Sequence, residues 1–371
     1  MVKMTGRALP NVRDVQRRAG WEWYVARTLA RGYAWDATGA VGSLWGSSPL
    51  TRSDDLWRVS GGLIDPDFGH VIAPPATVVE ESLPMAKLAR HRRGMPFFSG
   101  VPSLSGYVAA RVGRVPVRRE RVVVALRHPF AGNYYHALID VLPQLAILNA
   151  HGVPLDVPVV IDPSLATRPF FRELQTRGEL AKRHWLVQDA YIAADEILIP
   201  ILPPASRAGL DELLRMIGAP TPDPAAQRRL FLTRDPGNGG RAILNMGDVR
   251  PVIERHNLEI VDTAGMPFAA QMQLFSEARL VVAIHGAGLT NILFRRDAEL
   301  TVLEVLPLSE ENACFENLAR LYGHAHTSLR GAATMQGKMR HANFALDPDA
   351  LDAALRRCAT PEVGQGRSGS A

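Results

Sequence analysis

The sequence predicts an α/β protein whose second half is built on a parallel sheet. After residue 226, short apolar segments alternate with segments of helical periodicity, which is typical of a parallel sheet covered by helices. The chain has 371 residues, 47% of them hydrophobic, so it can bury a sizeable core. At roughly 150 residues per domain, this length predicts about two domains.

Residues 1–120 are rich in glycine, proline and short β-branched runs, which predict strands and turns. The next part has a strand-helix-strand rhythm, with strands at 121–126 and 158–161 and one long helix between them. A segment with five prolines, 201–226, has the composition of an interdomain connection and contains a short helix at 211–217. The predicted domains are 1–120, 121–210, 211–345, and a C-terminal helix with a disordered tail at 346–371.

The alternation after residue 226 gives the elements of the second half. An apolar run of strand length bounded by turn residues predicts a buried strand, and a 3.6-residue period predicts a helix. The predicted strands are 230–233, 258–261, 280–284 and 300–305. The predicted helices are 247–256, 268–278, 288–294 and 311–321.

Composition excludes several classes of protein. No stretch approaches the ~18 uncharged apolar residues of a membrane span, and the arginine-bearing N-terminus has no apolar signal segment. Cys314 and Cys358 are too few for a disulfide framework or a cysteine zinc site, which fits a reducing compartment. We expect a cytoplasmic protein without a membrane span. Peripheral membrane association stays compatible with these features.

The net charge of +5 comes mostly from arginines spread along the chain, because only four lysines are present. No basic stripe interleaves with aromatic residues, so we expect no nucleic-acid partner. The planar guanidinium group matches phosphate and carboxylate geometry. A small phosphorylated ligand is the expected anion.

The segment 279–291 contains the sharpest local motif. An apolar strand runs into the glycine turn Gly286-Ala287-Gly288, which opens a helix and exposes backbone N–H groups to an anion. Asn291 occupies the place of a third glycine, so the dinucleotide fingerprint is not satisfied. The alternative interpretation is a tight turn next to a hydrogen-bonded histidine. The candidate ligand-binding residues are His285, Gly286, Ala287, Gly288, Leu289, Thr290 and Asn291.

Glu304 lies near the carboxyl end of the next predicted strand. Ligands of open α/β sheets bind at that edge, where acidic groups accept hydrogen bonds from ribose hydroxyls. A capping or ion-paired glutamate is the alternative interpretation.

A polar stripe follows the first strand of the 121–210 region. Asn133, His136, Asp140 and Gln144 are spaced by three and four residues, so they share one helix face and His136 can contact Asp140. Pro143 should kink or end this part of the helix. The alternative is a solvated surface, although the stripe lacks the lysine and glutamate that such surfaces usually carry.

A third cluster follows the strand at 230–233. Arg234 ends this strand, and a glycine-rich loop then leads to Arg241 and Asn245. Arginine compensates a diphosphate through paired hydrogen bonds, so Arg234 is expected to face an interdomain cleft. Arg228 and Arg229 are interpreted as surface charge.

Taken in order over about residues 120–310, these segments resemble glycosyltransferase family 61, which is linked to capsular polysaccharide biosynthesis. Two positions depart from the family pattern: Ala137 replaces a frequent tryptophan, and Met246 replaces a common acidic residue. The resemblance is carried by Asn133-Tyr134-Tyr135-His136 with Asp140, Leu230–Arg234 with Arg241 and Asn245, Gln271 and Phe275, and His285–Asn291 with Glu304.

The resemblance implies a GT-B fold, in which two Rossmann-like domains face a cleft and the β-rich N-terminal portion belongs to the acceptor side. It also implies an inverting, metal-independent transfer from a nucleotide-sugar donor to a saccharide acceptor, in surface polysaccharide biosynthesis. Asp140 or His136 would be the base, and their roles are not separable from spacing alone. The donor would be bound by Asn133, Arg234, Arg241, Asn245, residues 285–291 and Glu304.

No cofactor or metal is expected. Paired aspartates hold a metal in many transferases, but Asp65-Pro66-Asp67 and Asp347-Pro348-Asp349 each contain a proline and are interpreted as turns. Arginines and the helix start at Gly286 would neutralise the diphosphate instead. Gln271 and Phe275 are assigned packing roles. The alternative functions are a non-catalytic nucleotide-sugar-binding protein and a nucleotide-sugar-modifying enzyme such as an epimerase.

Overall fold

A computed structural model describes residues 55–67, 69–74, 104–128, 130–202, 205–234, 240–307, 312–332 and 343–359, with short strands at 34–35, 41–42, 50–52 and 77–78. The chain forms two compact units. The first comprises 1–132, 141–168 and 182–203, and the second comprises 133–140, 169–181 and 204–371. Of the tail predicted to be disordered, 359–371, residue Ala359 ends a helix and residues 360–371 lie outside the described residues, as do most of residues 1–54 and all of 79–103.

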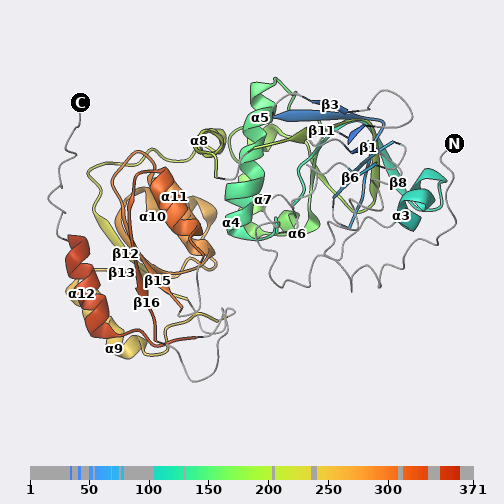
Figure 1. Ribbon diagram of the computed structural model, residues 1–371. Coiled ribbons are helices and arrows are strands. Elements are labelled where there is room, and N and C mark those ends of the chain that lie inside the picture. Colours follow the sequence, from blue (N-terminus) through green and yellow to red (C-terminus); the bar gives the residue numbers. More distant parts are fainter. Residues whose placement is uncertain are drawn as a thin grey trace, which may run out of the picture. The chain divides into compact units, whose positions relative to one another are not determined.

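The first unit contains a mixed sheet, shown in Figure 1. Its parallel strands are β8 (Val117–Ala125), β9 (Val159–Ile161), β10 (Trp185–Val187) and β11 (Tyr191–Pro200). They lie in the order β10-β9-β8-β11, the third, second, first and fourth strands in the chain, as in one half of a doubly wound fold. Antiparallel strands extend the sheet: β3 (Leu50–Arg52), β4 (Leu56–Ser60), β5 (Leu63–Ile64), β6 (Val71–Ala73) and β7 (Thr77–Val78).

The remaining elements of the first unit are short. Beta-branched residues such as Val123, Val124 and Ile197 are fully buried and form its core, since branched side chains pack well on a pleated surface. The helices and the separate strand pair are α3 (Leu104–Arg111), α5 (Leu145–Ala150), α6 (Pro163–Ala166), and β1 (Ala34–Trp35) with β2 (Val41–Gly42).

The second unit is built on a five-stranded, fully parallel sheet. The strands are β12 (Arg228–Leu232), β13 (Glu259–Val261), β14 (Ala278–Ile284), β15 (Thr301–Leu306) and β16 (Ala325–Arg330), in the order β13-β12-β14-β15-β16. β12, which comes first in the sequence among the strands of this sheet, therefore lies between β13 and β14, which come second and third. The connection direction reverses between β12 and β14, and ligands of open α/β sheets bind outside the carboxyl ends of strands at such a point.

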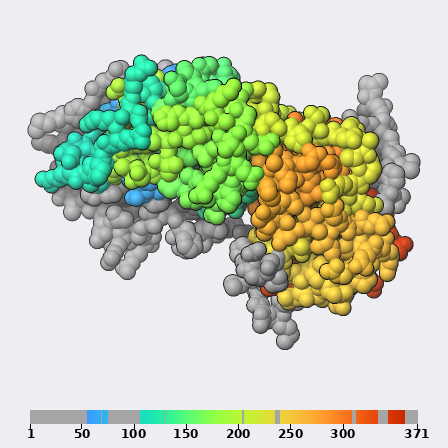
Figure 2. All heavy atoms as spheres, turned by 180° about the vertical axis from the view of Figure 1, so that it is seen from behind, coloured from blue at the N-terminus to red at the C-terminus, as the bar shows by residue number. Residues whose placement is uncertain are grey.

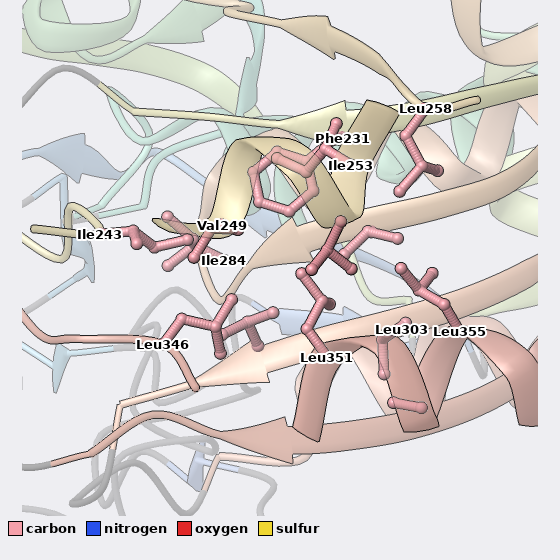
Figure 3. Close-up of a cluster of buried hydrophobic side chains, with 14 of the residues drawn as sticks. Phe231, Ile243, Val249, Ile253, Leu258, Ile284, Leu303, Leu346, Leu351 and Leu355 are labelled. Carbon is pink, nitrogen blue, oxygen red and sulfur yellow. The ribbon is translucent and has the colours of Figure 1, made fainter. Parts of the chain in front are cut away.

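Helices cover both faces of this sheet (Figure 1). On one face, Phe231 and Leu303 pack with Ile253 of α9 (Met246–Arg255) and with Leu351 and Leu355 of α12 (Pro348–Ala359), as Figure 3 shows. Fully burying such a side chain contributes roughly 1.5–3 kcal/mol. The helices of this unit are α7 (Pro169–Leu174), α8 (Arg207–Met216), α9 (Met246–Arg255), α10 (Phe268–Ser276), the 3-10 helix η7 (Ala287–Arg295), α11 (Cys314–Leu321) and α12 (Pro348–Ala359). The 3-10 turn η6 (Leu180–Lys182) includes the last two residues of the segment 169–181, and its third residue begins the segment 182–203 of the first unit. Figure 2 shows residues of about 205–300, coloured yellow to orange, on the surface of this unit.

The α/β class with parallel sheets is confirmed, and the four strands and four helices predicted after residue 226 are present with small shifts at their ends. The long helix predicted between the first two strands is wrong as a single element. It breaks into α4 (Tyr134–His136), a π-helical turn η4 (Ala137–Val141), a 3-10 turn η5 (Leu142–Gln144) and α5. Pro143 explains the break, because it has no backbone N–H and its ring collides with the preceding turn.

The two aspartate pairs differ. Asp65-Pro66-Asp67 is a turn as predicted, in which the Asp67 N–H donates to the Asp65 carboxylate. The prediction for Asp347-Pro348-Asp349 is wrong: Asp347 accepts from the Asp349 N–H and α12 begins at Pro348. Proline is preorganised for the first helical position, so the motif starts a helix. In the described part of the chain, no helix is long and apolar enough to span a bilayer.

Candidate functional site

A cavity of about 510 Å³ lies in the second unit, at the carboxyl ends of three neighbouring strands. Arg234 follows β12, Asp262 follows β13, and Gly286 follows β14; all three line the cavity. Tyr134 and Phe170 contribute aromatic walls from α4 and α7. The cavity thus opens at the reversal between β12 and β14, where the topology predicts a ligand.

Arg234 supplies the cationic wall of the cavity. Its guanidinium lies against the glycine turn, because a Cβ atom built on Gly286 would be 3.2 Å from Arg234 Nη2. Arg234 Nη1 donates to the Gly240 carbonyl at 3.4 Å. Burial lowers the pKa of Arg234 while Asp262 opposes this shift, and an arginine stays protonated under such conditions. Arg234 and Gly286 therefore lie together, as the motifs predict.

The glycine turn forms the start of η7. Gly286, Ala287, Gly288 and Leu289 all line the cavity. A Cβ on Gly288 would stand 3.2 Å from Thr263 Oγ1, so a larger residue would crowd the neighbouring loop. The turn places the start of a helix, with its partial positive charge, beside Arg234.

Asn291 and Thr290 lie inside the unit. Both are fully buried. The Tyr134 hydroxyl donates to Asn291 Oδ1 at 2.5 Å, and Asn291 Nδ2 donates to Gln271 Oε1 at 2.9 Å. Gln271 Nε2 in turn donates to the Met266 carbonyl at 2.9 Å. This chain of hydrogen bonds holds α4 and the loop after β13 on the cavity wall.

Phe275 is fully buried, in agreement with its predicted packing role, whereas Gln271 is buried but also lines the cavity. Burial raises the pKa of Tyr134 well above its usual value, with a further contribution from Glu173, so its hydroxyl stays protonated and remains a donor.

His285 and Glu304 form a buried network with a residue that the motifs did not indicate, His326 of β16. Glu304 Oε1 lies 2.6 Å from His285 Nδ1, and Glu304 Oε2 lies 2.9 Å from His326 Nε2. Burial alone would raise the pKa of Glu304, but the hydrogen bonds with the two histidines lower it. Each carboxylate oxygen therefore has an imidazole partner, and neither His285 nor Glu304 is among the residues that line the cavity.

Arg241 and Asn245 hold the segment before α9. Arg241 Nη1 donates to the His285 carbonyl at 2.9 Å. Asn245 Nδ2 donates to the Leu346 carbonyl, and the Leu346 N–H donates to Asn245 Oδ1, both at 2.9 Å. These bonds tie the start of α9 to the chain before α12.

The polar stripe gives an imidazole–carboxylate pair. His136 Nδ1 lies 2.7 Å from Asp140 Oδ2, and the Asn133 side chain accepts from the Tyr135 and His136 N–H groups at the start of α4. The His136 side chain is 31% exposed and that of Asp140 is 4% exposed. A carboxylate that fixes one imidazole nitrogen prepares the other nitrogen to accept a proton.

Aromatic rings connect this pair to the buried network. The Tyr135 ring packs edge-on against His136 and Phe315, with centroids 5.4 and 5.5 Å away. Phe315 packs against His285 at 5.1 Å. Both imidazole–carboxylate groups thus belong to the same unit as the cavity.

Residues 134–302 match the family model described as Glycosyltransferase 61. This region belongs to glycosyltransferase family 61. Among solved structures, the E. coli heptosyltransferase WaaC with ADP is similar over 65% of this chain and 98% of its own, with 10% sequence identity and a TM-score of 0.29. No curated relative matches the sequence.

The structure brings some of the predicted site residues to the cavity and others into hydrogen bonds elsewhere. Arg234 and residues 286–289 line the cavity, whereas the side chains of Asn133, Arg241, Asn245, Asn291 and Glu304 make hydrogen bonds within the protein. Sequence reasoning missed Asp262, Phe170 and His326. Asp262 carried a usable signal, because it directly follows a predicted strand.

Proposed function

We propose that this chain is an inverting, metal-independent glycosyltransferase that moves a sugar from a nucleotide-sugar donor to a saccharide acceptor in surface polysaccharide biosynthesis. The observation that carries the proposal is the cavity in which Arg234 and the start of η7 meet at the strand reversal. The family assignment supports glycosyl transfer. For the whole chain we propose the GT-B fold and a cytoplasmic location.

Diphosphate binding follows from the charges of the cavity. A leaving nucleoside diphosphate accumulates negative charge, and the Arg234 guanidinium with the N–H groups of Gly286–Gly288 supplies preorganised positive partners. Donors of this kind are typically worth roughly 3–4 kcal/mol in the transition state. Such partners take the place of a metal ion in our proposal.

The proton of the acceptor is assigned to the His136–Asp140 pair. The acceptor oxygen forms a bond to the anomeric carbon while the bond from that carbon to the diphosphate breaks, so the anomeric configuration inverts. The acceptor proton goes to His136, because this side chain is more exposed than Asp140. Asp140 then acts as a positioning residue that holds Nδ1 and stabilises the imidazolium.

The test is transfer activity of Asp140→Asn and His136→Gln, measured with a panel of nucleotide sugars and saccharide acceptors in the presence of EDTA. We expect each variant to lose about 10²–10⁴-fold in kcat, with nucleotide affinity unchanged. The matched control is Asp352→Asn, because Asp352 lies 2.8 Å from His256 in another imidazole–carboxylate pair outside the cavity.

Three outcomes would contradict the proposal. Donor conversion without an acceptor indicates an epimerase. Nucleotide-sugar binding without turnover by the wild type indicates a binding protein. Full activity of Asp140→Asn and His136→Gln removes the pair from the mechanism.

A further inference from the structure

We propose that Asp262 recognises the ribose of the nucleoside diphosphate by accepting hydrogen bonds from its vicinal hydroxyls, so that this site selects ribonucleotides. This inference rests on the proposed function and assigns the residue that determines one part of donor specificity. Asp262, which follows β13, thus takes the ribose-binding role that the sequence motifs indicate for Glu304 on β15.

The order of the strands places Asp262 beside the expected phosphate site. Strand β12 lies between β13 and β14, so the loop after β13 is on one side of Arg234 and the glycine turn after β14 is on the other. A diphosphate held by Arg234 and Gly286 leaves the β13 side of the cavity for the nucleoside. Carboxylates at carboxyl ends of strands recognise ribose in this way in other open α/β sheets.

The Asp262 side chain is held in place by its own loop. Its Oδ1 accepts from the Ala264 N–H at 2.8 Å, and Asp262 is one of the residues that line the cavity. An ionised carboxylate only accepts hydrogen bonds, whereas a diphosphate offers no donors at neutral pH. The ribose is the part of a nucleotide that offers two adjacent hydroxyl donors whatever its base.

The other acidic candidates are engaged elsewhere. Glu173 also lines the cavity, but its carboxylate accepts from the Phe268 and Ala269 N–H groups at the start of α10. Both oxygens of Glu304 are paired with histidines. Of the two acidic side chains that line the described cavity, Asp262 is thus the one that does not bond the start of α10.

The test compares ribose and deoxyribose ligands by titration calorimetry on the full chain. ADP, GDP, UDP and CDP are titrated first, and the tightest one is compared with its 2′-deoxy and 3′-deoxy forms. Wild type should bind the ribonucleotide about 10-fold to 100-fold more tightly than at least one deoxy form. The ratio should fall to about one in Asp262→Ala and to an intermediate value in Asp262→Asn, which keeps an acceptor for Ala264.

The affinity ratio separates recognition from simple charge. Removing a negative charge near a diphosphate strengthens binding of all forms equally, which leaves the ratio unchanged. Asp248→Asn removes the same charge from an exposed site outside the cavity and should retain the wild-type ratio.

Equal binding of all forms by the wild type, or an unchanged ratio in Asp262→Ala, would overturn the assignment of Asp262 and leave the proposed function standing. Failure of every nucleoside diphosphate to bind the wild type would contradict both.

Discussion

Replacing Glu304 by glutamine tests the buried network behind the glycine turn. Glutamine keeps one carbonyl oxygen that can accept from His285, but its amide group faces His326 Nε2 in place of a carboxylate oxygen. The wild-type carboxyl group is 2% exposed and has an imidazole nitrogen at 2.6 and 2.9 Å. Both hydrogen bonds therefore lose the charge of the carboxylate, and the bond to His326 also requires a tautomer change in this histidine.

A hydrogen bond to a charged group contributes about 1.5–3 kcal/mol and a neutral one about 0.5–1.5 kcal/mol. Each of the two bonds should therefore lose about 1–1.5 kcal/mol, and Glu304→Gln should lower the free energy of unfolding by about 2–3 kcal/mol. Glu304→Leu removes the carboxylate that both imidazoles share and should cost about 3–5 kcal/mol. Urea denaturation at pH 7 measures both values. The control is Glu316→Gln, an exposed pair with Arg320 on α11 that should change stability by less than about 1 kcal/mol. Equal effects for Glu304→Gln and Glu316→Gln would refute this reasoning.

Three further predictions concern the second unit. Arg295 is fully buried, and in its described hydrogen bonds the guanidinium donates to backbone carbonyls. Arg295→Met should therefore lower the free energy of unfolding by about 3–5 kcal/mol. The control Arg320→Met, at an exposed side chain, should lower it by about 0.5 kcal/mol. Burial lowers the pKa of His324 from 6.5 to about 4. Between pH 6.5 and pH 4 the unfolded chain therefore binds more protons than the folded chain, and the free energy of unfolding should fall by up to about 3 kcal/mol as the pH falls through this range. The same dependence of the free energy of unfolding on pH in His324→Phe would contradict this prediction. Tyr134→Phe removes the donor to Asn291 and should cost about 1–3 kcal/mol in thermal or urea unfolding, whereas no loss would show that this bond does not hold α4.

The sheet of the second unit could be predicted where strands are buried. Strands β14 and β15 are almost continuously apolar because helices cover both faces, and their segments stand out in the sequence. Strand β16 was missed for the opposite reason. It lies at the sheet edge, all six of its residues are exposed or partly exposed, and its sequence Ala-His-Thr-Ser-Leu-Arg lacks an apolar run.

The candidate site could be predicted in part for similar reasons. Arg234 and Gly286 follow recognisable strands, so their meeting at one sheet edge follows from topology. The second partner of Glu304 could not be found, because His326 lies on the missed strand and pairing across strands has no signature in a single sequence. Asn291 has the residue type of a ligand-binding side chain. Only the fold shows that its side-chain amide forms hydrogen bonds with Tyr134 and Gln271.

The central claim is that the cavity at the carboxyl ends of β12, β13 and β14 binds the diphosphate of a nucleotide, and calorimetric titration of nucleoside diphosphates against Arg234→Gln tests it most directly. The matched control is Arg279→Gln, because Arg279 lies near the amino end of β14 and pairs with Glu299. The account predicts that Arg234→Gln weakens binding at least about 10-fold while Arg279→Gln binds as the wild type does. Unchanged affinity in Arg234→Gln would contradict it.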